Sequence, residues 1–399
     1  MLFSRSSKNK LNLIIDIGSG SVGAGLVLES ANRPRVLFQT RSNIDLSSNL
    51  NFNSFLSEMT KSLRQVIEKV SKSRKGMPTK IRVFLSSPWA VSQTRVIKLR
   101  KNAEFTFTKK IADEYVGKEI CNFEKSSLNV YKNENQNMRL IEKELFQIKL
   151  NGYKTNNPFG KKTMSFEMFL FLTASPEKVI DFVAYEIKKF FNLPVKFSSF
   201  VLPSFVTIRD IFPDDRNFIM IDVAGEITDV SLIKDDILLE TSSFPLGRNS
   251  LIYNIAKLTG HNKTLAETFL DLYVDDKIQD KYKEKIRNIL LDYKKEWIKC
   301  LSKTFAIISK KIFLPSKIYL TADEDVEKLF KKYIEEEEWG QYFVTESKFN
   351  VIILNNRILH RFCKIESPLG GFTGWNYIND PFITIESIFI SKLRNERSE

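Results

Sequence analysis

The segments LNLIIDIGSGS (residues 11–21) and FIMIDVAGEITD (residues 218–229) carry the pattern that best indicates how this chain folds. In both segments an apolar run ends in an aspartate and leads into a turn that contains glycine. Such a run, followed by a glycine-containing turn and a second apolar segment, is typical of a buried strand that opens a β-hairpin. Because the same pattern occurs twice, the sequence predicts two related lobes that face one ligand.

The rest of the chain alternates between strand and helix patterns. Apolar residues recur at helical spacing over 52–70, 179–191 and 286–312, and each stripe predicts one buried helix face. A further helix is expected at 323–334, and a helix or strand at 381–393. Strands are expected at 11–17, 22–28, 35–40, 81–85, 218–222, 227–233, 237–243 and 317–321.

Residues 86–176 differ from their surroundings. Extended segments at 93–99, 142–150 and 164–173 accompany a helix at 108–123 and an asparagine-rich exposed loop at 129–137. This composition predicts a small α+β domain inserted into the first lobe. The expected organisation is 1–85 first lobe, 86–176 inserted domain, 177–215 first lobe again, 216–345 second lobe and 346–399 return to the first lobe.

Composition excludes several classes of protein. The 399 residues carry 43% hydrophobic and 27% charged residues, which is globular and not disordered composition. The chain has two histidines and three separated cysteines. These are too few to favour a histidine-based metal site, a Ser-His-Asp triad or a disulfide framework. No signal peptide and no apolar run of about 20 residues is present, so a cytoplasmic protein is expected.

The net charge of +13 is compatible with nucleic acid, an anionic membrane or an acidic partner. Lys and Arg are scattered among Glu and Asp along the expected helices, which favours solvated helix faces. No clustered basic face with stacking aromatics is visible, so nucleic acid is not an expected partner. Weak contact with anionic lipid is an alternative for the basic start of the chain, which contains Arg5, Lys8 and Lys10.

The first glycine-containing turn holds the residue types that bind phosphate. Glycines let backbone N–H groups approach an anion, and serine hydroxyls add donors. A carboxylate at the strand end can hold hydrated Mg²⁺ beside them. An ordinary Gly/Ser-rich hairpin turn is the alternative. The residues concerned are Asp16, Gly18, Ser19, Gly20 and Ser21.

The two turns together resemble the two phosphate loops of the actin, sugar kinase and heat-shock chaperone superfamily. The resemblance narrows to the FtsA and PilM branch through PLGRN (245–249), NGY (151–153), NPFGK (157–161) and the insertion at 86–176. It implies an α/β fold with two actin-like, ribonuclease H-like lobes around a central cleft and a small α+β domain inserted in the first lobe. It also implies ATP and Mg²⁺ as cofactors.

By this resemblance, Asp16 and Asp222 would hold the metal ion. The implied nucleotide-binding residues are Asp16, Gly18, Ser19, Gly20, Ser21, Asp222, Gly225, Thr228, Gly247 and Thr321.

Three of the four glycine-bearing loops depart from the family pattern. Ala224 and Glu226 replace glycines of the second phosphate loop, Arg248 replaces one glycine of a pair, and Asp323 stands in the adenosine loop. Glu226 would repel phosphate if it points inward, and the loop survives if it points outward. Asp323 is expected to be an N-cap, and Arg248 an outward, solvated side chain. We therefore expect weak or absent ATP hydrolysis and no catalytic residue, and the sequence leaves nucleotide binding open.

These features favour an FtsA-like cell-division scaffold that links a cytoskeletal polymer such as FtsZ to the membrane and forms actin-like protofilaments. A PilM-like type IV pilus assembly protein and an active actin-like ATPase are the alternatives. No separate membrane anchor is expected after 381–393, so recruitment to the inner face of the membrane would need a partner.

Overall fold

A computed structural model describes residues 10–30, 33–45, 51–127, 137–309, 313–343, 348–366 and 380–395. The loop expected at 129–137 and the basic start of the chain therefore lie almost entirely outside the described residues. The chain divides into two compact units. Unit 1 comprises Met1–Ser86, Val179–Ile211 and Leu354–Glu399, and unit 2 comprises Ser87–Lys178 and Phe212–Ile353.

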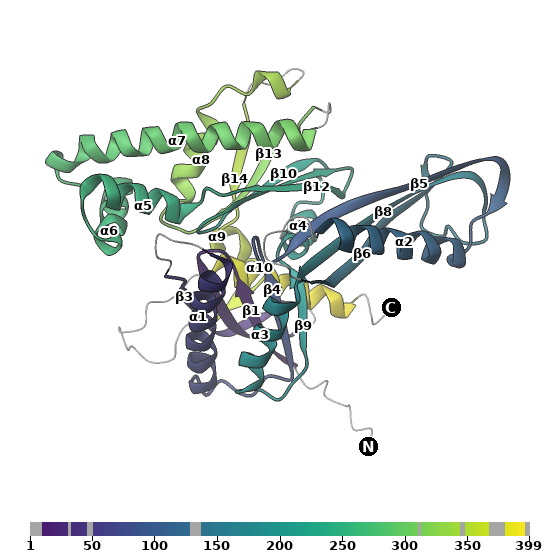
Figure 1. The fold of residues 1–399 in the computed structure, drawn as a ribbon, viewed down its shortest axis with the longest axis horizontal. Helices are drawn as coiled ribbons and strands as arrows, with labels where there is room; N and C mark the ends of the chain where they lie inside the picture. Colours follow the sequence, from purple (N-terminus) through teal and green to yellow (C-terminus); the bar gives the residue numbers. More distant parts are fainter. Residues whose placement is uncertain are drawn as a thin grey trace. The chain divides into compact units, whose positions relative to one another are not determined.

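Unit 1 is built on a six-stranded sheet in the order β15-β3-β2-β1-β4-β9 (Figure 1). Strand β1 pairs antiparallel with β2 and parallel with β4, which pairs parallel with β9. Every residue of β1 is buried, as its continuous apolar run predicts for a central strand covered on both faces. The strands are β1 (Leu11–Ile17), β2 (Ser21–Leu28), β3 (Arg35–Asn43), β4 (Lys80–Leu85), β9 (Val195–Ser199) and β15 (Lys364–Ile365).

Helices cover this sheet. Helix α1 buries the stripe predicted from its 3.6-residue spacing, and its N-cap Asn51 accepts a hydrogen bond from the Ser54 amide at 2.8 Å. In α3 the predicted stripe is buried except for Phe190, which lies just past the helix and is 38% exposed. The segment 381–393, open between helix and strand, is helical. The helices are α1 (Phe52–Lys72), α3 (Glu177–Lys188), α4 (Val201–Ile211), α9 (Asn356–Leu359) and α10 (Pro381–Asn395).

Unit 2 repeats the same sheet topology. Its five strands run in the order β12-β11-β10-β13-β14, and β10 pairs antiparallel with β11 and parallel with β13. The order and directions match β3-β2-β1-β4-β9 of unit 1, so the prediction of two related lobes is confirmed. The strands are β10 (Phe218–Val223), β11 (Thr228–Lys234), β12 (Ile237–Phe244), β13 (Lys317–Ala322) and β14 (Asn350–Ile353).

An aromatic core joins the helices of unit 2 to this sheet. Trp297 on α7 is fully buried, lies 5.0 Å from the Phe330 ring and donates from Nε1 to Thr228 Oγ1 at 3.1 Å. The described part of the stripe predicted over 286–312 is buried along α7. The helices are α5 (Arg248–Thr259), α6 (Lys263–Val274), α7 (Asp280–Ser309), α8 (Glu327–Glu335) and the short 3₁₀ helix η2 (Gly340–Tyr342).

The insertion forms a four-stranded antiparallel sheet, β5-β8-β6-β7, with helix α2 packed on it (Figure 1). Its elements are β5 (Val91–Thr106), α2 (Lys109–Ser127), β6 (Met138–Leu150), β7 (Tyr153–Lys154) and β8 (Lys162–Pro176). β5 extends beyond the expected 93–99 to Thr106. Its backbone stays paired with β8 there, although apolar and polar side chains no longer alternate along the strand. The sheet belongs to unit 2, where Thr241 Oγ1 donates to Ser92 O at 2.6 Å.

Candidate functional site

The first phosphate-loop candidate is the turn between β1 and β2. The Gly18 amide donates to Ser21 O at 3.0 Å, and the Ile44 amide donates to Gly20 O at 2.8 Å. Asp16 is 2% exposed at the end of β1, and Ser19 is fully buried. The five residues predicted here therefore do form one tight hairpin turn. Their roles toward nucleotide stay predictions.

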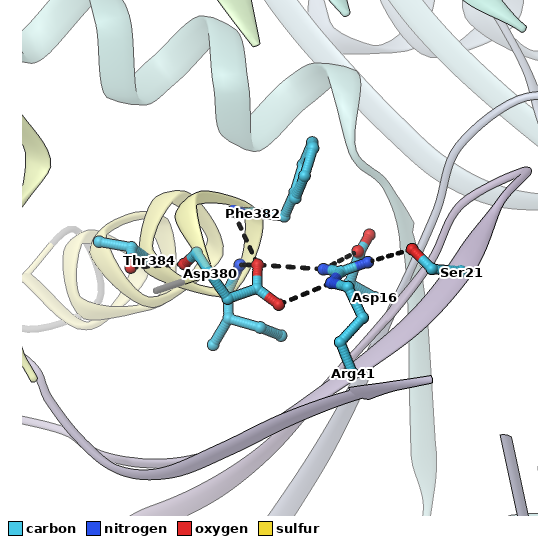
Figure 2. Close-up of polar contacts among 7 residues, drawn as sticks. Asp16, Ser21, Arg41, Asp380, Phe382 and Thr384 are labelled. Atoms are coloured by element: carbon cyan, nitrogen blue, oxygen red, sulfur yellow. Dashed lines mark hydrogen bonds and ion pairs between the residues drawn. The ribbon is translucent and has the colours of Figure 1, made fainter. Parts of the chain in front are cut away.

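The guanidinium group of Arg41 is bonded to two side chains of this turn, Asp16 and Ser21 (Figure 2). Arg41 on β3 bonds Asp16 Oδ2 through Nη2 at 2.6 Å and Ser21 Oγ through Nη1 at 2.8 Å. It also bonds Asp380 Oδ2 through Nε at 2.8 Å and Asp380 Oδ1 through Nη2 at 3.0 Å. The Arg41 side chain is only 14% exposed, and both carboxylates raise its pKa well above the ordinary value although burial opposes this. Two predicted ligand-binding side chains are thus held by an internal cation.

Three separate elements build this ion-pair cluster. Asp380 precedes α10 and accepts from the Phe382 and Ile383 amides at 3.1 Å, which caps the helix start. The Arg41 guanidinium lies 5.0 Å from the centre of the Phe382 ring. A Cβ atom at Gly23 would lie 2.6 Å from Arg41 Nη2, so only glycine leaves room for the guanidinium. Neither Arg41 nor Asp380 is among the site residues predicted from the sequence. The Asp-Pro pair at 380–381 is a helix-start signal that indicates the cap but not its partner.

The contact with Arg41 opposes a hydrated Mg²⁺ at Asp16. A divalent ion about 4 Å from the guanidinium would be repelled by about 8 kcal/mol at an effective dielectric of 20, and this repulsion works against the attraction of the ion to Asp16 and Asp380. Among the residues that the structure describes, no group of three His, Cys, Asp or Glu side chains is placed to hold a metal ion. The metal role of Asp16 stays a prediction, and its contact with Arg41 weighs against it.

A third carboxyl group lies beside the same cluster. Glu386 on α10 is fully buried, and neither of its oxygens accepts a hydrogen bond from any described residue. Burial raises the Glu386 pKa well above 4.5, and the negative charges of Asp16 and Asp380 raise it further, while Arg41 lowers it. Burial without a hydrogen-bond partner among the described residues therefore favours the neutral form of Glu386. Its place in an apolar-rich segment is the only feature of the sequence that points to Glu386.

Glu386→Gln is expected to raise the free energy of unfolding at neutral pH by about 1–3 kcal/mol. A group with a raised folded-state pKa stabilises the fold fully below its unfolded pKa, and this contribution is lost as pH rises toward the folded value. Gln abolishes that loss, so the gap between wild type and variant should widen as pH rises above about 5. Urea unfolding at about pH 5 and at neutral pH measures this gap. A constant gap would contradict the prediction.

In the second loop, the predicted residues bond mainly to one another and to the core. Asp222 Oδ1 accepts from Thr321 Oγ1 at 2.7 Å, so these two residues meet across β10 and β13. Thr228 is fully buried and donates from Oγ1 to Leu246 O at 2.6 Å. Gly225 is buried as well. These bonds link β10 to β13 and the start of β11 to the segment before α5. The role of these residues toward nucleotide stays a prediction.

Gly247 lets this loop dock on the start of α5. The Arg248 amide donates to Ala224 O at 3.0 Å, and the Asn249 amide donates to Gly225 O at 2.7 Å. A Cβ at Gly247 would lie 2.3 Å from Ala224 O and 2.6 Å from Gly225 O. The first amides of a helix are a common phosphate site, and here two of them are taken by carbonyl groups of the loop itself.

Two of the substituted positions, Arg248 and Asp323, differ from expectation. Arg248 was expected outward and solvated, and this is wrong: its side chain is 15% exposed and pairs with Asp325 at 2.6 Å. Asp323 was expected to cap α8, and this is also wrong, because α8 begins at Glu327 with Val326 as its N-cap. The Asp323 carboxylate lies 3.7 Å from Arg248.

Glu226 points toward the start of α5, where its Oε1 accepts from Asn249 Nδ2 at 2.9 Å. Burial raises the Glu226 pKa, and the bond from Asn249 lowers it. Neither the ion pair of Arg248 with Asp325 nor the bond between Glu226 and Asn249 could be predicted from the sequence, because the partners come from separate segments.

No protein-family model matches this sequence, and no curated protein matches it either. Its structure is similar to a chain of a PilM–PilN type IV pilus biogenesis complex, with 14% identity, a TM-score of 0.61 and coverage of 95% of this chain and 97% of that one. It also matches EutJ, an ethanolamine utilization protein from Carboxydothermus hydrogenoformans (10% identity, TM-score 0.41, coverage 96% and 89%). A further match is a Bacteroides thetaiotaomicron protein with an actin-like ATPase fold (10% identity, TM-score 0.39, coverage 98% and 99%).

Proposed function

We propose that this chain, which has the actin-like ATPase fold, is a non-enzymatic assembly scaffold that docks on protein partners at a membrane. The observation that carries the proposal is the Arg41 cluster, because its buried guanidinium is bonded to the Asp16 carboxylate that would otherwise hold the metal ion. The ion pairs of Arg248 and the docking of the second loop on α5 support it. An enzyme that positions Mg²⁺ and ATP needs these groups free for its ligand.

Two assembly roles fit the proposal. The similarity to the PilM chain along nearly the whole length of both chains favours a PilM-like role with a pilus component as partner. The motifs at 151–153 and 157–161 favour the FtsA-like division role, with an FtsZ-like polymer as partner. Self-polymerisation is compatible with both. Sedimentation of the chain with FtsZ polymers, and capture on an immobilised cytoplasmic tail of a pilus membrane protein, separate the two.

We expect no phosphate release from ATP above the protein-free blank, with or without Mg²⁺. Calorimetry is expected to show that Mg²⁺ does not strengthen ATP binding, because the guanidinium already occupies the Asp16 carboxylate. Asp16→Asn is the comparison variant. Mg²⁺-dependent turnover in the wild type that Asp16→Asn abolishes would overturn the proposed function and favour the active ATPase.

A further inference from the structure

One edge of the unit 1 sheet gathers basic side chains that the linear sequence scatters. Strands β1, β4 and β9 are parallel, so their first residues meet at the same edge. Helices α1 and α3 precede β4 and β9, and their last turns therefore lie at this edge too (Figure 1). The Thr79 amide donates to Leu11 O at 2.7 Å, which fixes the loop after α1 against the start of β1.

We name this surface the basic edge. Its members are Lys10, Lys69, Lys72, Arg74, Lys75, Lys80, Lys188, Lys189 and Lys196.

The carboxylates at this surface are paired. Glu68 bonds Lys72 at 2.5 Å, and Glu29 lies 3.7 Å from Lys80. Glu186 is buried under Lys189 and Arg64, and the hydrogen bond from Arg64 is the largest of the effects that lower its pKa to about 2. The basic edge therefore keeps an excess of positive charge around neutral pH.

Exposed apolar side chains lie among these cations. Met77, in the loop after α1, is 71% exposed, and Phe190, just past α3, is 38% exposed. Tyr185 is 62% exposed, and the Lys189 ammonium lies 4.3 Å from the centre of its ring. Apolar and aromatic side chains interleaved with lysines are characteristic of protein surfaces that rest on anionic lipid headgroups.

We propose that the basic edge binds the surface of an anionic membrane directly. A membrane surface complements the basic edge in two ways. Its phosphate headgroups supply the anions, and the boundary between headgroups and acyl chains can accommodate Met77 and Phe190. A nucleic acid or a purely acidic polypeptide would satisfy the charges but offer Met77 no apolar environment. Within the described residues no helix is both long and apolar enough to cross a bilayer, and the contact proposed here is peripheral. It deepens the proposed scaffold function by adding a lipid contact to the partner contact.

The test is flotation of the full chain with two kinds of vesicle, phosphatidylcholine alone and phosphatidylcholine mixed with phosphatidylglycerol. Binding is expected only to the anionic vesicles, and it should weaken as salt shortens the screening length. The triple variant Lys69→Gln, Lys75→Gln and Lys188→Gln is expected to bind about 100-fold more weakly. Each lysine near an anionic leaflet contributes about 1 kcal/mol, and about 1.4 kcal/mol is a factor of ten.

The matched control is Lys285→Gln, Lys299→Gln and Lys303→Gln on α7, which changes the net charge equally at exposed positions. It should bind within about twofold of wild type. Met77→Ser should lower the binding that persists at high salt. No binding to anionic vesicles, equal losses in both triple variants, or binding to DNA or polyglutamate in place of vesicles would each overturn the proposal. The partner assays of the proposed function do not depend on these outcomes.

Discussion

Replacing Arg41 with methionine is expected to lower the free energy of unfolding by about 3–5 kcal/mol. The change removes the cation from two buried carboxylates, Asp16 and Asp380, which are 2% exposed each. An uncompensated buried charge costs more than the ion pair contributes. Urea unfolding monitored by circular dichroism measures the loss.

Arg35→Met on the same strand is the control for Arg41→Met. Arg35 pairs with Glu366 at the surface, with 44% of its side chain exposed, so its loss should cost less than about 1 kcal/mol. The triple variant Arg41→Met, Asp16→Asn and Asp380→Asn removes all three charges and should recover part of the stability. Equal losses in Arg41→Met and Arg35→Met would show that the cluster does not stabilise unit 1.

Replacing Gly247 with alanine is expected to destabilise unit 2 by about 3 kcal/mol. The added Cβ would lie 2.3 Å from Ala224 O, and backbone cannot yield as a flexible side chain can. The loop must then move away from α5 and break the bond from the Asn249 amide to Gly225 O. Tyr293 Oη, which donates to Gly247 O at 2.8 Å, should lose this partner as well.

Gly117→Ala in α2 is the matched control for Gly247→Ala. A Cβ there meets nothing within 4 Å, and alanine is the better helix former, so a gain of about 0.5–1 kcal/mol is expected. Thermal and urea unfolding of both variants would decide the matter. A neutral Gly247→Ala would mean that the loop and α5 separate readily, and the helix start would then be open to an anion.

The repeated strand–turn–strand unit and the helix faces could both be predicted from the sequence. These features depend on periodicity and on glycine, which act within a few residues. The stripes of α1 and α7 followed because residues at helical spacing share one face. Phe190 departed from its stripe because α3 ends at Lys188, and the period no longer applies beyond a helix end.

The site depended on contacts that no local pattern records. Asp16 was predicted as a metal residue from its place at a strand end, whereas its bonded neighbour Arg41 lies on β3 and the shared Asp380 lies far along the chain. Asp323 and Arg248 were each interpreted alone. In the structure they lie in one cluster of charged side chains, which brings together the start of α5 and the segment between β13 and α8.

The sequence alone thus determined which residues form the strands, the turns and the buried helix faces, because backbone conformation and burial period are local properties. How the buried charges are compensated depends on the tertiary structure. A buried charge takes whichever partner the packing of distant elements brings within hydrogen-bond distance, and that choice made Arg41 the cation beside Asp16.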